Sequence, residues 1–104
     1  MKKFYSGKYI RKEVLEENNI HYPIRVDYYS ILNEEKYGLE VVKTEYRNEG
    51  VKVENKVIKN LTKDEKQIDL VLLTLSKGIV TPICTQEVVD ELLNIPYENK
   101  EREF

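Results

Sequence analysis

The sequence has few of the residues that metal sites, disulfide scaffolds and membrane spans require. Its 104 residues include one cysteine, Cys84, and one histidine, His21, so no internal disulfide can form and a metal site would need other ligands. A single cysteine fits a reducing compartment. The longest hydrophobic run, residues 70–73, is far too short to span a membrane, and no signal-like hydrophobic run follows the basic start. We therefore expect a cytoplasmic protein with no bound metal.

Charge and glycine content argue against further classes of protein. Seventeen basic and nineteen acidic residues are interspersed and give a net charge of −2, so no overall field attracts nucleic acid. The four glycines are isolated, which excludes a phosphate-binding glycine loop, and no nucleophile-elbow motif is present. Cys84 and His21 could act as a nucleophile pair only if the fold brought them together. We expect no catalytic residues and no cofactor.

The hydrophobic residues follow two different patterns. Up to about residue 60 they mostly alternate, as in Val51-Lys52-Val53, and from Thr62 onward they recur every three or four residues. Alternation lays one face of a strand on a core, whereas the second spacing lays one stripe of a helix on a core. We predict one α+β domain over residues 1–96, with a four-stranded antiparallel sheet followed by two C-terminal helices packed on one face. A frayed, charged tail would cover residues 97–104.

The expected strands are joined by short polar turns. They cover residues 9–17, 21–32, 37–47 and 51–61, after a loose entry over residues 1–8. The first of them could equally form a helix; the pair Asn18-Asn19 favours a strand, since it is typical of a hairpin turn. Short connections imply antiparallel neighbours.

The two helices show capping signals. Thr62 and Glu65 have the spacing of a capping box, and Gly78 follows the first helix as a stop signal. The inner face of this helix is expected to hold Ile68, Val71, Leu72, Leu75 and Ile79. The second helix should begin with Thr81 as cap and Pro82 in its first position. Its apolar stripe comprises Val88, Val89, Leu92 and Leu93.

The eight tyrosines hold the strongest functional signal. Tyr28 and Tyr29 must point to opposite faces of a strand, so if Tyr28 faces the helices, Tyr29 faces outward. Exposed tyrosine beside arginine is typical of protein interfaces, although such tyrosines could also stack on nucleic-acid bases or simply lie half-buried in a sheet. The predicted partner-binding residues are Tyr29, Arg25, Tyr46 and Arg47.

These features favour a noncatalytic protein-interaction module, such as a small regulator or inhibitor that binds another protein. A nucleic-acid-associated regulator is the second alternative, and a small enzyme using Cys84 or His21 is the third. A homodimer could also form through an open edge strand, such as Tyr9–Glu17.

Four short motifs together resemble a known family. They are Tyr-Gly-Leu-Glu-Val-Val-Lys-Thr-Glu at residues 37–45, Ile-Lys-Asn-Leu-Thr at 58–62, Val-Thr-Pro-Ile at 80–83 and Val-Val-Asp-Glu-Leu at 88–92. Their order and spacing over residues 10–94 resemble a family of small uncharacterised proteins from clostridia and related Firmicutes, a domain of unknown function. The resemblance implies a cytoplasmic bacterial protein and no activity. The family pattern often places a histidine near position 84, which argues against an essential role for Cys84.

Overall fold

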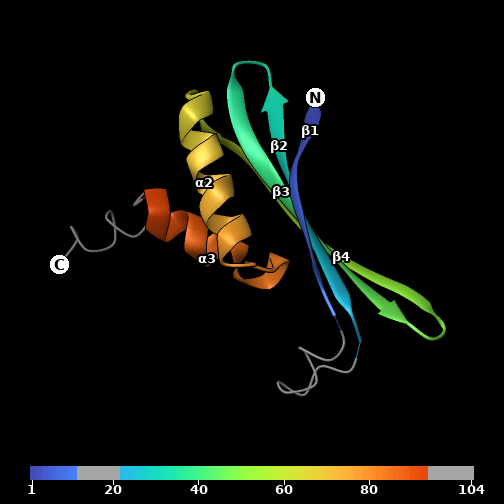
Figure 1. Ribbon diagram of the computed structural model, residues 1–104. Helices are drawn as coiled ribbons and strands as arrows, with labels where there is room; N and C mark the ends of the chain where they lie inside the picture. The colour runs from blue at the N-terminus through green and yellow to red at the C-terminus, as the bar shows by residue number, and fades with distance from the viewer. Residues whose placement is uncertain (12–21, 94–104) are drawn as a thin grey trace.

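The computed structural model describes residues 1–11 and 22–93 and has two layers, a sheet and a pair of helices (Figure 1). In chain order, the elements are β1 (Lys2–Ile10), β2 (Ile24–Asn33), β3 (Lys36–Arg47), β4 (Gly50–Thr62), α2 (Glu65–Lys77) and α3 (Pro82–Leu93). The prediction of an α+β fold, with four antiparallel strands followed by two C-terminal helices on one face, is confirmed. The turn expected at Asn18-Asn19, His21 and the tail at residues 97–104 lie outside the described residues.

The strands lie in the order β1-β2-β3-β4, each antiparallel to its neighbour. The two-residue turns Glu34-Glu35 and Asn48-Glu49 impose this arrangement on β2, β3 and β4, because parallel pairing would need much longer connections. The first strand corrects a prediction. It starts at Lys2, where a loose entry was expected, and the expected strand 9–17 overlaps it only at Tyr9 and Ile10; residues 12–17 are not described. Most side chains of this edge strand are exposed, so hydrophobic alternation does not reveal it.

The core lies between the helices and the inner face of the sheet. Its strand residues are Ile24, Val26, Tyr28, Leu39, Val41 and Ile58, all buried. The helices add Ile68, Val71, Leu72, Leu75 and Val89, with Leu93 packed against this cluster. The predicted inner face of α2 is therefore confirmed, except that Ile79 is 37% exposed rather than buried.

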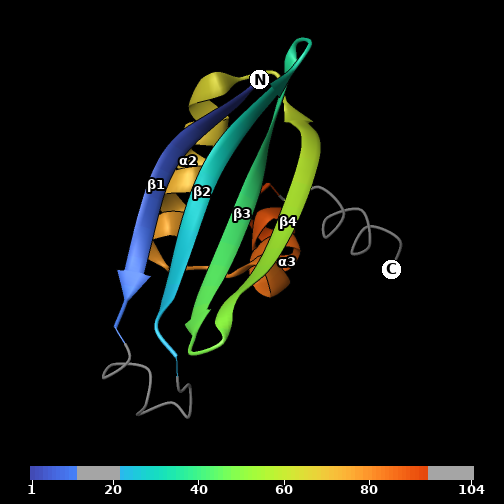
Figure 2. The same ribbon diagram turned by 90° about the vertical axis from the view of Figure 1, so that its right-hand side faces the viewer.

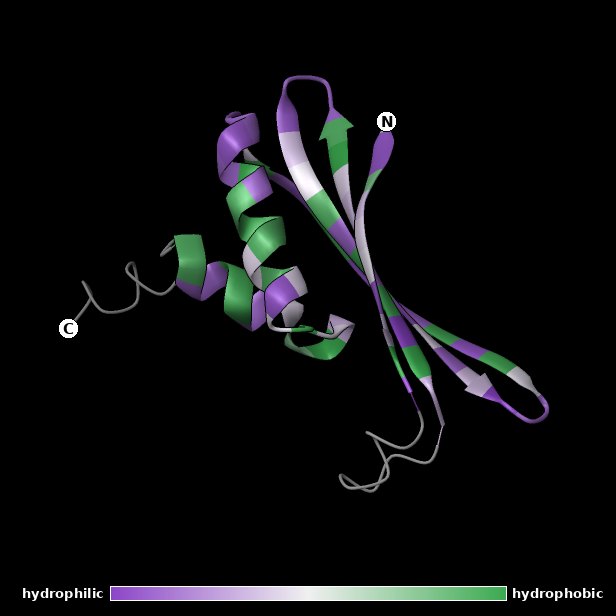
Figure 3. Cartoon of the chain, viewed as in Figure 1, coloured by the Kyte–Doolittle hydropathy of each residue, from purple (hydrophilic) through white to green (hydrophobic). Residues whose placement is uncertain are grey.

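The helices cover only part of the sheet, and the β3–β4 hairpin projects beyond them (Figure 1). On the helix side of this hairpin, Lys43 lies opposite Glu54 and Glu45 lies opposite Lys52. These residues are charged because no helix covers them. Val51 and Val53 lie on the other side and are 61% and 57% exposed, so the prediction that the alternating valines lie on a core is wrong. Figure 3 shows hydrophobic and hydrophilic residues alternating along the projecting hairpin.

Helix α2 starts later than the capping box predicts. Its N-cap is Asp64, whose Oδ1 accepts a hydrogen bond from the Lys66 backbone N–H at 2.9 Å. Thr62 is still paired with Tyr37 as the last residue of β4. Its hydroxyl accepts from the Asp64 N–H at 3.1 Å and donates to Gln67 at 2.6 Å, so it supports the turn rather than capping the helix. The predicted capping box between Thr62 and Glu65 is wrong.

Two nested backbone hydrogen bonds cap the C-terminal end of α2. The N–H of Ile79 donates to Ser76 at 3.2 Å, and the N–H of Val80 donates to Leu75 at 3.0 Å. This is the Schellman pattern, which requires a left-handed residue. Ile79 takes that conformation, with φ of 50°, whereas Gly78 has φ of −85°. The stop lies one residue beyond the expected glycine, and this turns Ile79 away from the core.

Loss of the Asp64 cap should weaken α2. We expect Asp64→Ala to lower the free energy of unfolding by about 1 kcal/mol, because the Lys66 N–H loses its acceptor. Lys63→Ala changes an exposed neighbour and should be close to neutral. Urea unfolding of both variants measures the difference, and equal losses would contradict the assignment of Asp64 as the cap.

Two adjacent leucines of α2 test the position of the core. Leu72 is fully buried, so Leu72→Ala should lower the free energy of unfolding by about 2–5 kcal/mol. Leu73 is 38% exposed on the outer side of the same turn, and Leu73→Ala should have an effect no larger than about 1 kcal/mol. Denaturant midpoints measure both; a larger loss at Leu73 would place the core on the other side of α2.

Candidate functional site

The face of the sheet opposite the helices is uncovered in the part of the chain that the structure describes (Figure 2). We call it the open face. Strand register and alternation assign to it Lys2, Phe4, Tyr9, Arg25, Asp27, Tyr29, Ile31, Asn33, Lys36, Glu40, Val42, Thr44, Tyr46, Val51, Val53, Asn55 and Val57. Aromatic and β-branched side chains dominate this set, and six of these residues are large hydrophobics that remain exposed: Phe4, Tyr9, Tyr46, Val51, Val53 and Val57.

One aromatic cluster joins β1 and β2 on the open face. The rings of Phe4 and Tyr29 meet edge to face, with centroids 5.6 Å apart and planes at 74°. The Lys2 ammonium lies 4.6 Å from the centre of the Tyr29 ring and 3.0 Å from Glu40 Oε1. Such contacts hold Tyr29 in place, half-buried on the open face.

Glu40 is the charged centre of this cluster. The Asn55 side-chain amide donates to Glu40 Oε2 at 3.0 Å, and Lys2 donates to the other oxygen. Partial burial by itself raises the pKa of Glu40, but the hydrogen bonds from Asn55 and Lys2, with the charge of Lys2, together hold that pKa below its ordinary value. The carboxylate therefore stays ionised and paired.

A second cluster lies farther along the open face. Tyr9 and Tyr46 have ring centroids 6.2 Å apart, and Tyr9 is 56% exposed. Arg25 Nε and Asp27 Oδ1 form an ion pair at 2.8 Å in the adjacent part of β2. This pair lies across Gly7 of β1, where any side chain would collide with both charged groups. Gly7 thus lets the arginine lie flat against the sheet.

The predicted binding residues do not all share one face. Arg25, Tyr29 and Tyr46 lie on the open face, and their role in binding stays a prediction. Arg47 follows Tyr46 directly and points to the opposite side, as alternation requires. There it pairs with Glu45, and its guanidinium lies 5.2 Å from the centre of the Tyr22 ring.

Sequence reasoning missed a large share of the open face. Phe4 belongs to residues expected to be a loose entry, and the valines of β4 were assigned to a core. The prediction that both helices pack on one face of the sheet could have revealed them. In β4 the alternating valines and Ile58 point to opposite faces, so helices on one face must leave one of these two sets exposed.

Tyr28 and Tyr29 separate as predicted. Tyr28 is fully buried against the helices, and its hydroxyl donates to the Val80 carbonyl at 3.0 Å. Burial, with a smaller contribution from the negative charge of Asp27, raises the pKa of Tyr28 far above its ordinary value. The phenol therefore acts as a neutral hydrogen-bond donor.

No catalytic arrangement is apparent among the described residues. Cys84 is exposed in the first turn of α3. His21 lies outside the described part of the chain, so a Cys84–His21 pair stays a prediction. Residues 1–11 and 22–93 contain no group of three acidic, histidine or cysteine residues that could hold a metal ion. Nor does any helix described there have the length and hydrophobicity needed to cross a membrane.

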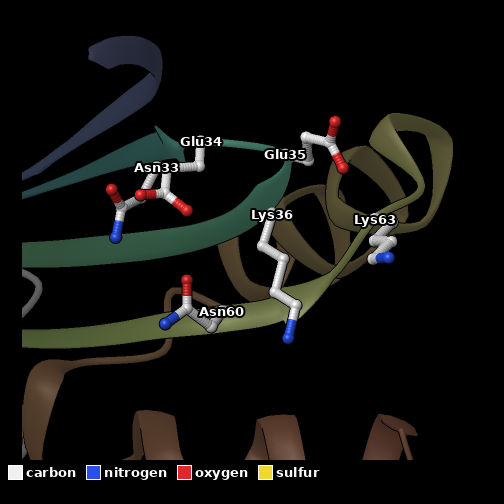
Figure 4. A pocket seen from close by; sticks show the side chains of 6 residues that line it. All are labelled: Asn33, Glu34, Glu35, Lys36, Asn60 and Lys63. Carbon is white, nitrogen blue, oxygen red and sulfur yellow. The ribbon is translucent and has the colours of Figure 1, made fainter.

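A depression of about 450 Å³ lies beside the β2–β3 turn (Figure 4). It is lined by Asn33, Glu34, Glu35, Lys36, Asn60 and Lys63. Figure 4 shows these side chains splayed in different directions rather than converging on one point. Its acidic and basic groups balance, so it offers neither an anion site nor a cation site.

The comparisons with known proteins agree with the motifs in the sequence. The family model described as "Family of unknown function (DUF6514)" matches residues 1–94. The chain matches no curated protein and no solved structure.

The buried phenol predicts a change of stability at high pH. Unfolded Tyr28 loses its proton near pH 10, whereas the folded phenol keeps it, so the unfolded state binds fewer protons there. The free energy of unfolding should therefore fall as pH rises above about 10.

Tyr28→Phe should lower the free energy of unfolding by about 1 kcal/mol at neutral pH, because the hydrogen bond to the Val80 carbonyl is lost. Its alkaline fall should be shallower than that of the wild type. Tyr46→Phe, at an exposed tyrosine, serves as control and should keep the wild-type profile in urea unfolding.

Proposed function

Since the chain belongs to DUF6514, a family of unknown function, we propose a role from its own surface: a noncatalytic module that binds another protein through the open face. It would act as a small regulator or inhibitor, by surface complementarity rather than by chemistry. The observation that carries this proposal is the exposed aromatic and valine side chains on a sheet face that no described element covers (Figure 2). Tyr9, Tyr46 and Val51 are neighbours on this face, and a patch of exposed apolar side chains marks an interaction site in many soluble proteins.

The composition of the open face supports a protein partner. Tyr29 is held by Phe4 and Lys2, so its ring has little freedom to lose on binding. Rigid aromatic residues near the middle of a contact surface are the usual anchors of protein interfaces. Arg25, held by Asp27 opposite Tyr9 in the second cluster, adds a guanidinium to the same face.

The charges on this face favour a protein over a nucleic acid. Lys2 is paired with Glu40, and Arg25 with Asp27, so each of these cations already has an acidic neighbour. Nucleic-acid binding depends on cations that neutralise phosphates. The expected partner is therefore a largely apolar protein surface without strong charge.

The cellular setting is also part of the proposal. The single, exposed Cys84 is compatible with a reducing compartment, which supports the cytoplasm. The four motifs that resemble clostridial and related Firmicutes proteins support a bacterial origin.

Substitution of Tyr29 tests the proposal. With the affinity-tagged chain as bait, Tyr29→Ala should weaken capture of the bound protein by about 30-fold, the effect of losing an anchor worth about 2 kcal/mol. The thermal midpoint should change little, because the side chain lies on the outer face. The matched control is Glu87→Ala, an exposed residue of α3 on the opposite side of the molecule, which should leave capture unchanged.

Salt dependence separates the two kinds of partner. Capture of a protein should change little between 50 and 200 mM salt, a range over which phosphate contacts lose roughly 10³-fold or more in affinity. Unchanged capture by Tyr29→Ala together with loss in Glu87→Ala would place the binding surface on the helices instead.

A further inference from the structure

The sheet has two edge strands, β1 and β4, and no described strand pairs with the outer side of either. Each edge presents a row of backbone N–H and C=O groups that can pair with another strand. The sequence pattern suggested an edge near Tyr9–Glu17 for a homodimer. The two edges differ in charge and regularity, however, and these differences decide which one suits a second copy.

Strand β1 is poorly suited to pairing with itself. It carries Lys2, Lys3 and Lys8 and no acidic residue, so pairing with a second copy would bring the lysines of both strands together without an acidic residue of either strand between them. Its register also shifts between Phe4 and Ser6, which interrupts the regular edge. Lysines and a bulge are the devices by which natural edge strands avoid pairing.

Strand β4 carries both acidic and basic residues, and it is regular from Gly50 to Ile58, with its own register shift against β3 only beyond Ile58. It is the longest strand, with 13 residues, and its first half lies in the hairpin that projects beyond the helices (Figure 1). Its sequence is self-complementary about Asn55. When two copies pair antiparallel with Asn55 opposite itself, Glu54 of each lies opposite Lys56 of the other. In the same register, Val53 lies opposite Val57, and both are exposed on the open face.

Charge, length and the regularity of β4 select this register. Centring the pairing on Val57 would carry it through Asn60, where φ is 57° and the register against β3 shifts. Centring the pairing on Glu54 would place Glu54 opposite itself and Lys52 opposite Lys56, both repulsive. Centring it on Val53 would pair only residues 50–56, because the turn at Asn48-Glu49 ends the strand. The register centred on Asn55 pairs residues 50–60.

We propose that two copies of this chain associate through antiparallel pairing of β4, with Asn55 on the two-fold axis. The two four-stranded sheets would become one continuous eight-stranded sheet, with both pairs of helices on the same side. The Val53–Val57 contacts form a seam on the shared open face, and the Glu54–Lys56 pairs lie on the other side. This association is independent of the proposed partner protein.

A cysteine on the two-fold axis tests the register. In a Cys84→Ser background, Asn55→Cys should give a covalent dimer under mild oxidation, since residues opposite each other in a sheet have Cα separations within the range of a disulfide. The matched control is Val53→Cys on the same strand and face. In this register the two copies of residue 53 lie about 13 Å apart or more, beyond the limit of about 7 Å. Equal cross-linking of both variants, or cross-linking of Ser6→Cys in β1 but not of Asn55→Cys, would overturn the proposal.

Charge reversal tests the pairing without a cysteine. Glu54→Lys or Lys56→Glu alone should weaken dimerisation by about 10-fold, because each places like charges opposite each other at two symmetry-related positions. The double variant Glu54→Lys with Lys56→Glu should restore it. Sedimentation equilibrium gives the dimer constant, and thermal unfolding confirms that each variant is folded, which matters because Glu54 also lies opposite Lys43 within the chain. A wild-type protein that stays monomeric at millimolar concentration, or a double variant no tighter than the singles, would refute this interface.

Discussion

The fold depends on a mismatch between its two layers: the helices are shorter than the strands they cover. Helix α2 has 13 residues, a length of about 20 Å, whereas the 13 residues of β4 extend about 43 Å. Two such helices can bury one face of the sheet and only part of its length. On β3 and β4 the core therefore ends near Val41 and Ile58, whereas on β2 it continues to Ile24. Beyond it, the β3–β4 hairpin has charged residues on its helix side, because no helix covers them there. The opposite face remains open along the whole sheet.

Within the covered part, one buried hydrogen bond joins the sheet to the helical layer. The Tyr28 hydroxyl reaches from the middle of β2 to the Val80 carbonyl, in the connection between α2 and α3. Val80 is placed there by the Schellman turn at Ile79, and it directly precedes Thr81 and the start of α3. A buried phenol without a partner would be destabilising by about 1–3 kcal/mol, so the position of this carbonyl constrains the helical layer. The left-handed conformation of Ile79, which a β-branched residue rarely adopts, is the local strain that this arrangement accepts.

The sequence predicts those parts of the fold in which hydrophobic pattern and burial coincide. In β2, Ile24, Val26 and Tyr28 alternate and are buried, and in α2 the helical stripe is the buried stripe. It fails where tertiary context decides. Strand β1 is held by backbone pairing with β2 and shows little hydrophobic pattern of its own. The N-cap of α2 is Asp64 and not the predicted Thr62, because pairing with Tyr37 keeps Thr62 in the sheet. For the site, alternation correctly placed Tyr28 and Tyr29 on opposite faces. The same alternation places Tyr46 and Arg47 on opposite faces, so they cannot belong to one binding surface as their residue types suggested.

The exposed valines of β4 belong both to the open face and to an edge strand of the sheet. Alternation shows that a strand has two faces, but not which of them a helix will cover, and here Ile58 takes the covered side while Val53 and Val57 stay on the open face. An exposed valine row on an edge strand can be buried in two ways: by a partner lying on the face, or by a neighbouring strand beside it. The first uses side chains and the second uses backbone groups of the edge. Because the two contacts use different groups, pairing through β4 would enlarge the open face without covering it, and the same molecule could form both.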